Sequence, residues 1–259
     1  MNKIKSISLL LTFVMLLGAV AACGPADDPG GTTVAPTDGT APQPTGEAKT
    51  YATAEDGKQR QILGRLLGID GNDAWILLDN SIVDGKVRKF DDVVIVSFDE
   101  LPRDTFYHED LLIYGVYLFD LKSTMERGGR GNPSTADAIA VERVNRQEVQ
   151  LQQVVKLDIN LGMKIKQQFP ELPLVDVREE TEYADGHLPG ADQVSVSGLS
   201  GKIGMAAPLT EVPAMVYCRS GRRSETAAFQ MQHLGYRLII DLGGIQDYNG
   251  EVETGMPEK

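Results

Sequence analysis

"VYCRSGRRSETAAFQMQHLGY", Val216–Tyr236, holds a cysteine that is followed at once by a loop with three arginines. The apolar run Ala214–Cys218 comes just before this loop, and it is typical of a strand buried on both faces. After the loop, apolar residues recur at helical spacing, namely Ala227, Ala228, Met231 and Leu234. A buried strand, a short loop and an amphipathic helix together indicate a unit of a parallel α/β sheet.

The predicted helix after this loop begins near Ser224. Ser224 is a suitable N-cap, Glu225 is favourable in the first turn, and Gly235 is suitable for the end of the helix. A loop between a strand end and a helix N-terminus directs several backbone N–H groups at one point, which makes it an anion site. Gly221 allows the tight bend that such a loop needs.

Cys218 lies where these N–H groups and arginines converge. Both the N–H groups and the helix dipole favour the thiolate, so we expect the pKa of Cys218 to be lowered. Arg219, Arg222 and Arg223 add positive charge that attracts an anionic substrate. The loop therefore predicts a thiol that is exposed and reactive. The alternative is a buried, inert cysteine beside solvated arginines.

The rest of the C-terminal half alternates between apolar runs and helical patterns. "LPLVDV" and "RLIIDL" indicate strands, and "GMKIKQQF" indicates a short helix that ends at Pro170. A further strand is expected in "DQVSVS", whereas Asp192–Pro213 is rich in glycine and marks a helix poorly. This alternation predicts an α/β domain with a parallel central sheet.

Three stretches, in this order along the chain, resemble the motifs of the rhodanese-like family of single-domain sulfurtransferases. They are "LVDVREETEYADGHLPGA" (Leu174–Ala191), the cysteine loop with its helix, and "LIIDLGGIQDY" (Leu238–Tyr248). The resemblance covers the chain from about Gly162 to its end, and we expect a rhodanese-like domain over residues 158–259. Tyr248 stands where the family usually has tryptophan, and Gln193, Val194 and Ser195 depart from its usual residues.

The resemblance implies a role for each matching residue. Cys218 corresponds to the nucleophile that carries sulfur as a persulfide, and the loop that holds the substrate corresponds to Arg219, Ser220, Gly221, Arg222, Arg223 and Ser224. Asp176 and Arg178 correspond to supporting residues near the site, and we expect His187 to have a structural role. The chemistry implied needs no metal and no organic cofactor.

The predicted function is transfer of sulfane sulfur from thiosulfate, or a similar donor, to a thiophilic acceptor such as cyanide or a protein thiol. One alternative is a membrane-tethered sulfur carrier or sensor with little turnover. Another is a cysteine phosphatase, whose loop needs five residues between the cysteine and an arginine. Here Ser224 stands at that place and Arg223 comes one residue early, which favours sulfur over phosphate.

The N-terminus predicts export and a lipid anchor. Lys3 and Lys5 precede the apolar run Ile7–Leu17, and "VAAC" resembles a bacterial lipobox that ends at Cys23. We therefore expect a lipoprotein signal peptide at 1–22 and lipidation of Cys23. A flexible tether rich in proline, glycine and threonine is expected at 23–57. The predicted location is the extracytoplasmic side of a bacterial envelope membrane. The alternative is an ordinary signal peptide with a chance cysteine.

Residues 58–150 contain five short apolar runs separated by turn-like segments. They are "RQILGRLLGI", "AWILLD", "VVIVSF", "LLIYGVYLF" and "ADAIAVERV". This pattern predicts a small all-β domain, possibly OB-like. Some OB barrels bind nucleic acid through aromatic residues, and Trp75, Tyr114, Tyr117 and Phe119 are present here. The net charge of −12 argues against nucleic acid as a partner, so we expect these aromatic residues to be core.

Overall fold

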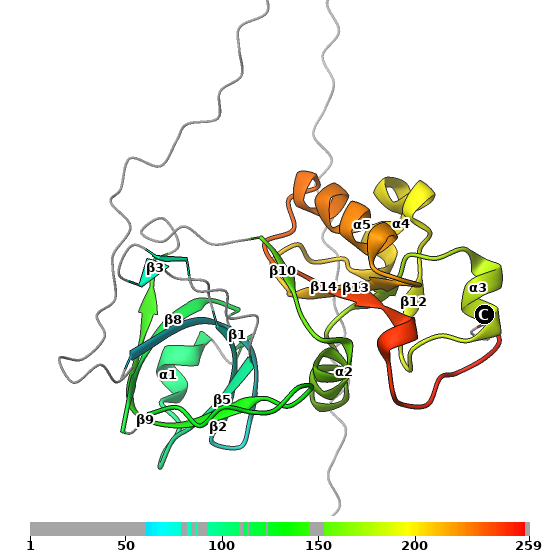
Figure 1. Ribbon diagram of the computed structural model, residues 1–259. Helices are drawn as coiled ribbons and strands as arrows, with labels where there is room; N and C mark the ends of the chain where they lie inside the picture. Colours follow the sequence, from blue (N-terminus) through cyan, green and yellow to red (C-terminus); the bar gives the residue numbers. More distant parts are fainter. Residues whose placement is uncertain are drawn as a thin grey trace, which may run out of the picture. The chain divides into compact units, whose positions relative to one another are not determined.

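The computed structural model (Figure 1) describes residues 61–78, 82–83, 86–87, 93–108, 111–112, 114–122, 124–145 and 153–256. All of them fall within one compact unit, Pro44–Lys259. The predictions for the signal peptide, for Cys23 and for the tether at 23–57 lie outside the described residues. In the described part of the chain, no helix has the length and apolarity to cross a bilayer.

A closed β-barrel forms where the five apolar runs predict strands (Figure 1). Its strands follow the order β1-β2-β5-β9-β8 around the barrel. Neighbouring strands are antiparallel except for β5 and β9, which are parallel. The bounds are β1 Gln61–Asp70, β2 Asp73–Leu78, β5 Val93–Ser97, β8 Val116–Leu121 and β9 Ser134–Val144.

Short elements connect the barrel strands. The helix α1, Arg103–Phe106, lies between β5 and β8 along the chain. Two short antiparallel ribbons also occur: β3 Ile82–Val83 pairs with β4 Lys86–Val87 between β2 and β5, and β6 Tyr107–His108 pairs with β7 Leu111–Leu112 after α1. The predicted run "LLIYGVYLF" thus divides into β7 and β8.

Aromatic side chains fill the barrel. Phe106, Tyr117 and Phe119 are completely buried, and the ring centroids of Phe106 and Tyr117 lie 4.9 Å apart. Trp75 belongs to a different core cluster, where it packs edge-on against Phe169 with ring centroids 5.7 Å apart. Such contacts add to the stabilisation from burial alone. Trp75, Tyr117 and Phe119 are therefore core residues, as the sequence predicts. Tyr114 is only partly buried, although it packs against the core.

The C-terminal part is a five-stranded sheet with the order β10-β14-β13-β11-β12, and all its strand pairs are parallel (Figure 1). The strands are β10 Val154–Lys156, β11 Leu174–Asp176, β12 Asp192–Gln193, β13 Ala214–Cys218 and β14 Ile239–Gly244. The helices are α2 Ile159–Gln168, α3 Glu180–Asp185, α4 Leu199–Ala206 and α5 Arg222–His233, with 3-10 turns η2 Val196–Gly198 and η3 Ile245–Asp247. The prediction of a parallel α/β sheet is confirmed.

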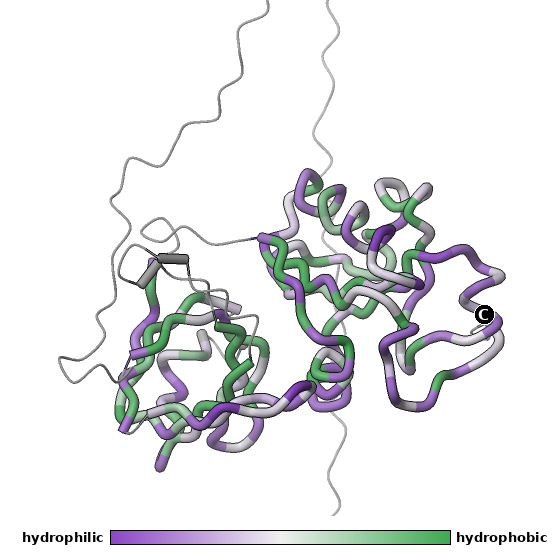
Figure 2. The backbone as a smooth tube through the Cα atoms, in the orientation of Figure 1, coloured by the Kyte–Doolittle hydropathy of each residue, from purple (hydrophilic) through white to green (hydrophobic). Residues whose placement is uncertain are grey.

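The apolar patterns explain this packing. Every residue of β13 is buried, because helices cover both faces of the strand. Ala227, Ala228 and Met231 turn the apolar face of α5 inward and are completely buried. Figure 2 shows hydrophobic residues concentrated along the sheet strands, with hydrophilic residues on outward parts of the helices.

Three local predictions are wrong. The helix α5 begins at Arg222 rather than near Ser224, and its N-cap is Gly221, whose φ of 97° only glycine adopts readily. Leu234 is the C-cap and is 41% exposed rather than packed on the sheet. The predicted strand "DQVSVS" is reduced to β12, because Val196 already begins the turn η2.

The predicted limits of the C-terminal domain also miss one element. The edge strand β10 pairs with β14 but lies before residue 158, where the sequence placed the start of the domain. A strand of three residues is too short to be distinguished from a connector by its periodicity. The helix α4 lies in the glycine-rich segment where the sequence marked a helix poorly.

Candidate active site

Cys218 is the last residue of β13, at the carboxyl edge of the parallel sheet. Ligands of open α/β sheets bind at this edge. The loop after Cys218 lies against the end of β14. A Cβ added to Gly244 would stand 2.5 Å from the Arg219 carbonyl oxygen and 2.7 Å from the Ser220 Cα. Since neither backbone atom moves easily, the double glycine of β14 allows the cysteine loop to close.

The loop surrounds the sulfur with polar groups. The Gly221 N–H donates to Cys218 Sγ at 3.1 Å, and Ser224 Oγ lies 3.8 Å from the sulfur. Ser224 is completely buried, and its hydroxyl is 2.9 Å from the Gly221 carbonyl oxygen and 3.3 Å from that of Gly243. Ser224 thus ties the first turn of α5 both to the loop and to β14.

Two opposing effects act on the thiol. Burial raises the pKa of Cys218, but hydrogen bonds from the backbone N–H groups of Ser224, Ser220 and Gly221 lower it. The hydrogen bonds prevail, so the pKa of Cys218 lies below that of an ordinary cysteine. The direction agrees with the prediction from the loop.

The predicted exposure of Cys218 is wrong. The residue is 1% exposed, and its carbon atoms belong to an apolar cluster with Val175 and Val194. The buried strand carries the Cβ into the core, and the loop folds its N–H groups over the sulfur. Cys218 therefore combines polar partners at the sulfur with shielding from bulk solvent, which favours small reagents over bulky ones.

The three loop arginines occupy different surroundings. Arg223 forms a bidentate ion pair with Glu182 of α3, with N–O distances of 2.6 and 2.7 Å. The hydrogen bond from Arg223 lowers the pKa of Glu182 to about 2. Arg219 and Arg222 are exposed, and neither forms an ion pair with a carboxylate among the described residues. These two remain available to attract an anion.

Glu182 was not singled out from the sequence. It lies in the run "REETEY", where three carboxylates and two hydroxyls offer similar partners to a cation. The only local signal is its spacing from Glu179, with which it forms the capping box of α3. That spacing predicts a helix start and says nothing about an arginine far along the chain.

Asp176 and Arg178 form a buried ion pair rather than a contact with the sulfur. Their side chains are 0% and 7% exposed, and the Arg178 guanidinium donates to both carboxylate oxygens of Asp176. Arg178 also donates to the Gly186 carbonyl oxygen at 2.7 Å. The pair connects the end of β11 to the end of α3 and supports the site through the backbone.

His187 is buried and packs against α3. Its ring stacks on Tyr183 at 3.7 Å, and Nδ1 lies 3.0 Å from the Tyr183 carbonyl oxygen. Nε2 lies 3.5 Å from a Glu253 carboxylate oxygen. These contacts are structural, as the sequence predicts for His187. Among the residues that the structure describes, no group of three or more His, Cys, Asp or Glu could hold a metal ion.

Replacing Ser224 by alanine should raise the pKa of Cys218, because the hydroxyl is one of the groups that lower it. The measurement is the rate of alkylation by iodoacetamide as a function of pH. In the unmodified protein the rate should stay high below the ordinary cysteine pKa of about 8.5. In Ser224→Ala the midpoint should move to higher pH. Ser200→Ala, on the exposed face of α4, is the matched control, and equal midpoints in both variants would contradict the assignment.

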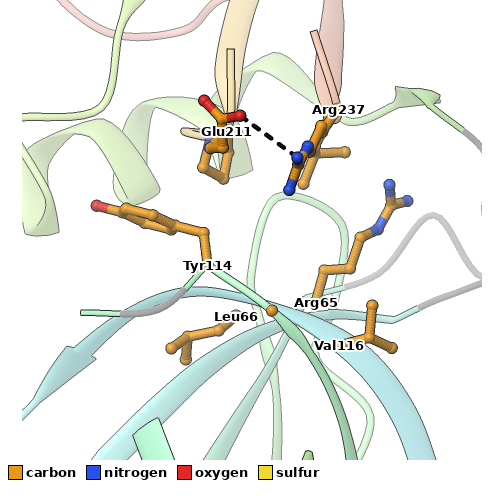
Figure 3. A pocket seen from close by; sticks show the side chains of 9 residues that line it. Arg65, Leu66, Tyr114, Val116, Glu211 and Arg237 are labelled. Carbon is orange, nitrogen blue, oxygen red and sulfur yellow. Dashed lines mark ion pairs between the residues drawn. The ribbon is translucent and has the colours of Figure 1, made fainter. Parts of the chain in front are cut away.

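A small pocket lies between Arg65, Leu66, Tyr114 and Val116 of the barrel and Glu211 and Arg237 (Figure 3). Glu211 and Arg237 form an exposed ion pair at 3.4 Å. The volume of the pocket is about 20 Å³, which is enough for roughly one water molecule. The pocket is too small for a substrate.

The chain is similar to known proteins over its C-terminal part. The family model described as "Rhodanese-like domain" matches residues 162–251. The thiosulfate sulfurtransferase PspE of Escherichia coli is 30% identical over 28% of this chain and 70% of its own length. A solved structure described as "rhodanese with anions from E. coli" is 28% identical, covers 32% of this chain and 98% of its own length, and has a TM-score of 0.31.

Other relatives are matched over a smaller share of their length. YrkF of Bacillus subtilis, named as a candidate sulfur carrier, is 32% identical over 32% of this chain and 44% of its own length. The chain thus spans less than half of that relative. The identity with PspE over most of its length, together with the family match, shows that the chain belongs to the rhodanese-like family through its C-terminal domain.

Proposed function

We propose that the protein is a sulfurtransferase that moves sulfane sulfur from thiosulfate, or a similar anion, to a thiophilic acceptor through a persulfide on Cys218. The observation that supports this most directly is the environment of the Cys218 sulfur. The sulfur accepts a hydrogen bond from the Gly221 N–H, its pKa is lowered, and it stands at the carboxyl edge of the sheet. Family membership supports sulfur transfer as the class of chemistry.

The proposed reaction has two half-steps. The Cys218 thiolate attacks the outer sulfur of thiosulfate, a new S–S bond forms, and sulfite leaves with the electron pair of the broken bond. The acceptor then attacks the terminal sulfur of the persulfide, and the electron pair returns to Cys218 as thiolate. Backbone N–H groups of the loop stabilise the anionic persulfide, while Arg219 and Arg222 attract the donor.

Incubation with thiosulfate and cyanide tests the proposal, with thiocyanate as the product measured. We expect turnover with thiosulfate and no hydrolysis of an aryl phosphate by the same preparation. The loop supports sulfur over phosphate, because Arg223 is held by Glu182 and comes one residue too early to complete a phosphate loop. Hydrolysis of the aryl phosphate without thiocyanate formation would overturn the proposal in favour of the phosphatase.

The second candidate is a sulfur carrier or sensor with little turnover. The burial of Cys218 favours it, since a shielded persulfide is protected from stray thiols. Mass spectrometry would detect one added sulfur on Cys218 in either case. If Cys218 takes up one sulfur atom and passes it only to a protein thiol, the protein is a carrier. Repeated turnover with cyanide identifies the enzyme.

We further propose that the barrel is OB-like and that the chain is a lipoprotein anchored by Cys23. The strand order and the single parallel pair between β5 and β9 support the first proposal. The apolar run and "VAAC" support the second. A mass increase on the N-terminal peptide of the exported protein, lost in Cys23→Ser, is the test of the anchor.

A further inference from the structure

Four large apolar side chains are exposed in the C-terminal halves of α4 and α5 or just after these helices. They are Met205, Leu209, Phe229 and Leu234, which we call the apolar patch. Each is between 41% and 87% exposed. The other exposed large apolar side chains of the described residues, Ile139, Val252 and Met256, lie elsewhere in the chain. Single exposed apolar residues need no explanation, whereas several on one face mark an interaction site.

The two helices present the patch on one face of the sheet. Figure 1 shows α4 and α5 side by side on the same face, and both contribute to the same core cluster. Two hydrogen bonds join the segments that follow the helices. The Tyr236 hydroxyl donates to the Ala207 carbonyl oxygen, and the Arg237 N–H donates to the Thr210 carbonyl oxygen at 2.9 Å. The ends of α4 and α5 are therefore fixed next to each other.

The patch and the cysteine loop lie toward opposite edges of the sheet. The helix α5 begins after the carboxyl end of β13 and ends before the amino end of β14. The helix α4 likewise ends before the amino end of β13. The C-terminal halves of both helices are therefore near the amino edge, whereas Cys218 is at the carboxyl edge. The five residues of β13 separate the two edges by roughly 15 Å.

The charges around the patch differ from those of the whole chain. The chain has a net charge of −12, but Val194–Tyr236 holds four Lys or Arg and two carboxylates. Both carboxylates form ion pairs, Glu211 with Arg237 at 3.4 Å and Glu225 with a lysine of β10 at 2.9 Å. An apolar face within a locally cationic segment complements an anionic lipid surface. Pairing of the patch with a second copy would instead bring like charges together.

We propose that the apolar patch docks onto an anionic lipid surface and directs the Cys218 loop away from the lipid. The inference rests on the proposed anchor at Cys23 for its proximity to a membrane. Gln61, the first described residue, comes 38 residues after Cys23. A coil of that length spans roughly 35 Å, which corresponds to a local concentration in about the millimolar range. At such a concentration a weakly binding face is sufficient.

Quenching of tryptophan fluorescence by brominated lipid tests the docking. The chain has one tryptophan, Trp75, which is buried in the core. The exported full-length protein is reconstituted in vesicles of brominated phosphatidylcholine and phosphatidylglycerol. We expect strong quenching in Phe229→Trp and none in the unmodified protein. The matched control is Ile139→Trp, an exposed apolar position on β9 of the barrel. Equal quenching in both variants, or in neither, would overturn the inference.

A second substitution in the Phe229→Trp protein measures what the patch contributes. Met205→Gln should lower the ratio of docked to undocked protein roughly ten-fold, because one apolar side chain fewer leaves water. The matched control is Val252→Gln, which lies outside the patch and should leave the ratio unchanged. Lys202→Gln should lower the ratio roughly five-fold on anionic vesicles and have no effect on phosphatidylcholine alone. Docking that is unaffected by Met205→Gln would show that the patch is not the lipid-binding face.

Two further results separate this inference from the proposals above. Alkylation of Cys218 by iodoacetamide should be equally fast with and without vesicles, and slower alkylation on vesicles would overturn the proposed orientation. An exported protein without lipid on Cys23 would overturn the anchor alone, because quenching measured in an excess of vesicles still tests the patch. Thiosulfate turnover enters neither measurement, so failure of the proposed sulfurtransferase leaves this inference standing.

Discussion

Replacing Cys218 by serine should lower thiosulfate:cyanide turnover by more than about a thousand-fold, to the background rate. A serine hydroxyl is far less acidic than a thiol and cannot carry a persulfide. The N–H groups of Gly221 and its neighbours would remain in place but would have no sulfur anion to stabilise. The measurement is thiocyanate formation under saturating thiosulfate.

The control for this variant is a measurement that shows it still folds. Serine is close in size to cysteine, and urea unfolding should show a native transition in Cys218→Ser. Mass spectrometry after incubation with thiosulfate should show one added sulfur in the unmodified protein and none in the variant. Thiocyanate formation that persists in a folded Cys218→Ser protein would exclude Cys218 as the carrier of sulfur.

The second large effect concerns stability. Arg178→Leu should lower the free energy of unfolding by about 3–5 kcal/mol, because it leaves the Asp176 carboxylate buried without its cation. Asp176 is 0% exposed, and Arg178 provides its hydrogen bonds at 2.9 and 3.0 Å. The loss of the bond to Gly186 would also free the end of α3. Urea unfolding at neutral pH measures the effect.

Two further variants isolate the cause. In the double variant Asp176→Asn with Arg178→Leu no charge is left buried, so much of the lost stability should return. Lys122→Gln removes an exposed ion pair with Asp99, whose side chain is 89% exposed, and should cost at most about 1 kcal/mol. An Arg178→Leu protein as stable as Lys122→Gln would show that the buried pair does not stabilise the fold.

Much of the fold could be predicted from local patterns. The five apolar runs of the barrel region and the run Ala214–Cys218 are strands in the structure, because continuous or alternating burial leaves a period in the sequence. The helix that follows the cysteine loop was predicted for the same reason. Its start was misplaced, since Gly221 in a left-handed conformation begins the helix without a capping side chain.

The candidate site was predictable only in part. The position of Cys218 at a strand end and the lowered pKa follow from a contiguous stretch, Val216–Tyr236. The partner of Arg223 did not follow, because Glu182 lies 41 residues away in the chain and is one of several acidic residues in its segment. The exposure of the apolar patch did not follow either, because Leu234 continues the helical spacing of the buried residues of α5.

The sequence by itself determined which segments become strands and helices and where the thiol stands along them, because these properties depend on neighbours in the chain. The tertiary structure alone decided that Cys218 is 1% exposed, that Arg223 is tied to Glu182, and that the apolar patch gathers at the ends of α4 and α5. The reason is physical. Burial, ion pairing and surface patches depend on how segments distant in sequence pack, and no periodicity in a single segment records that packing.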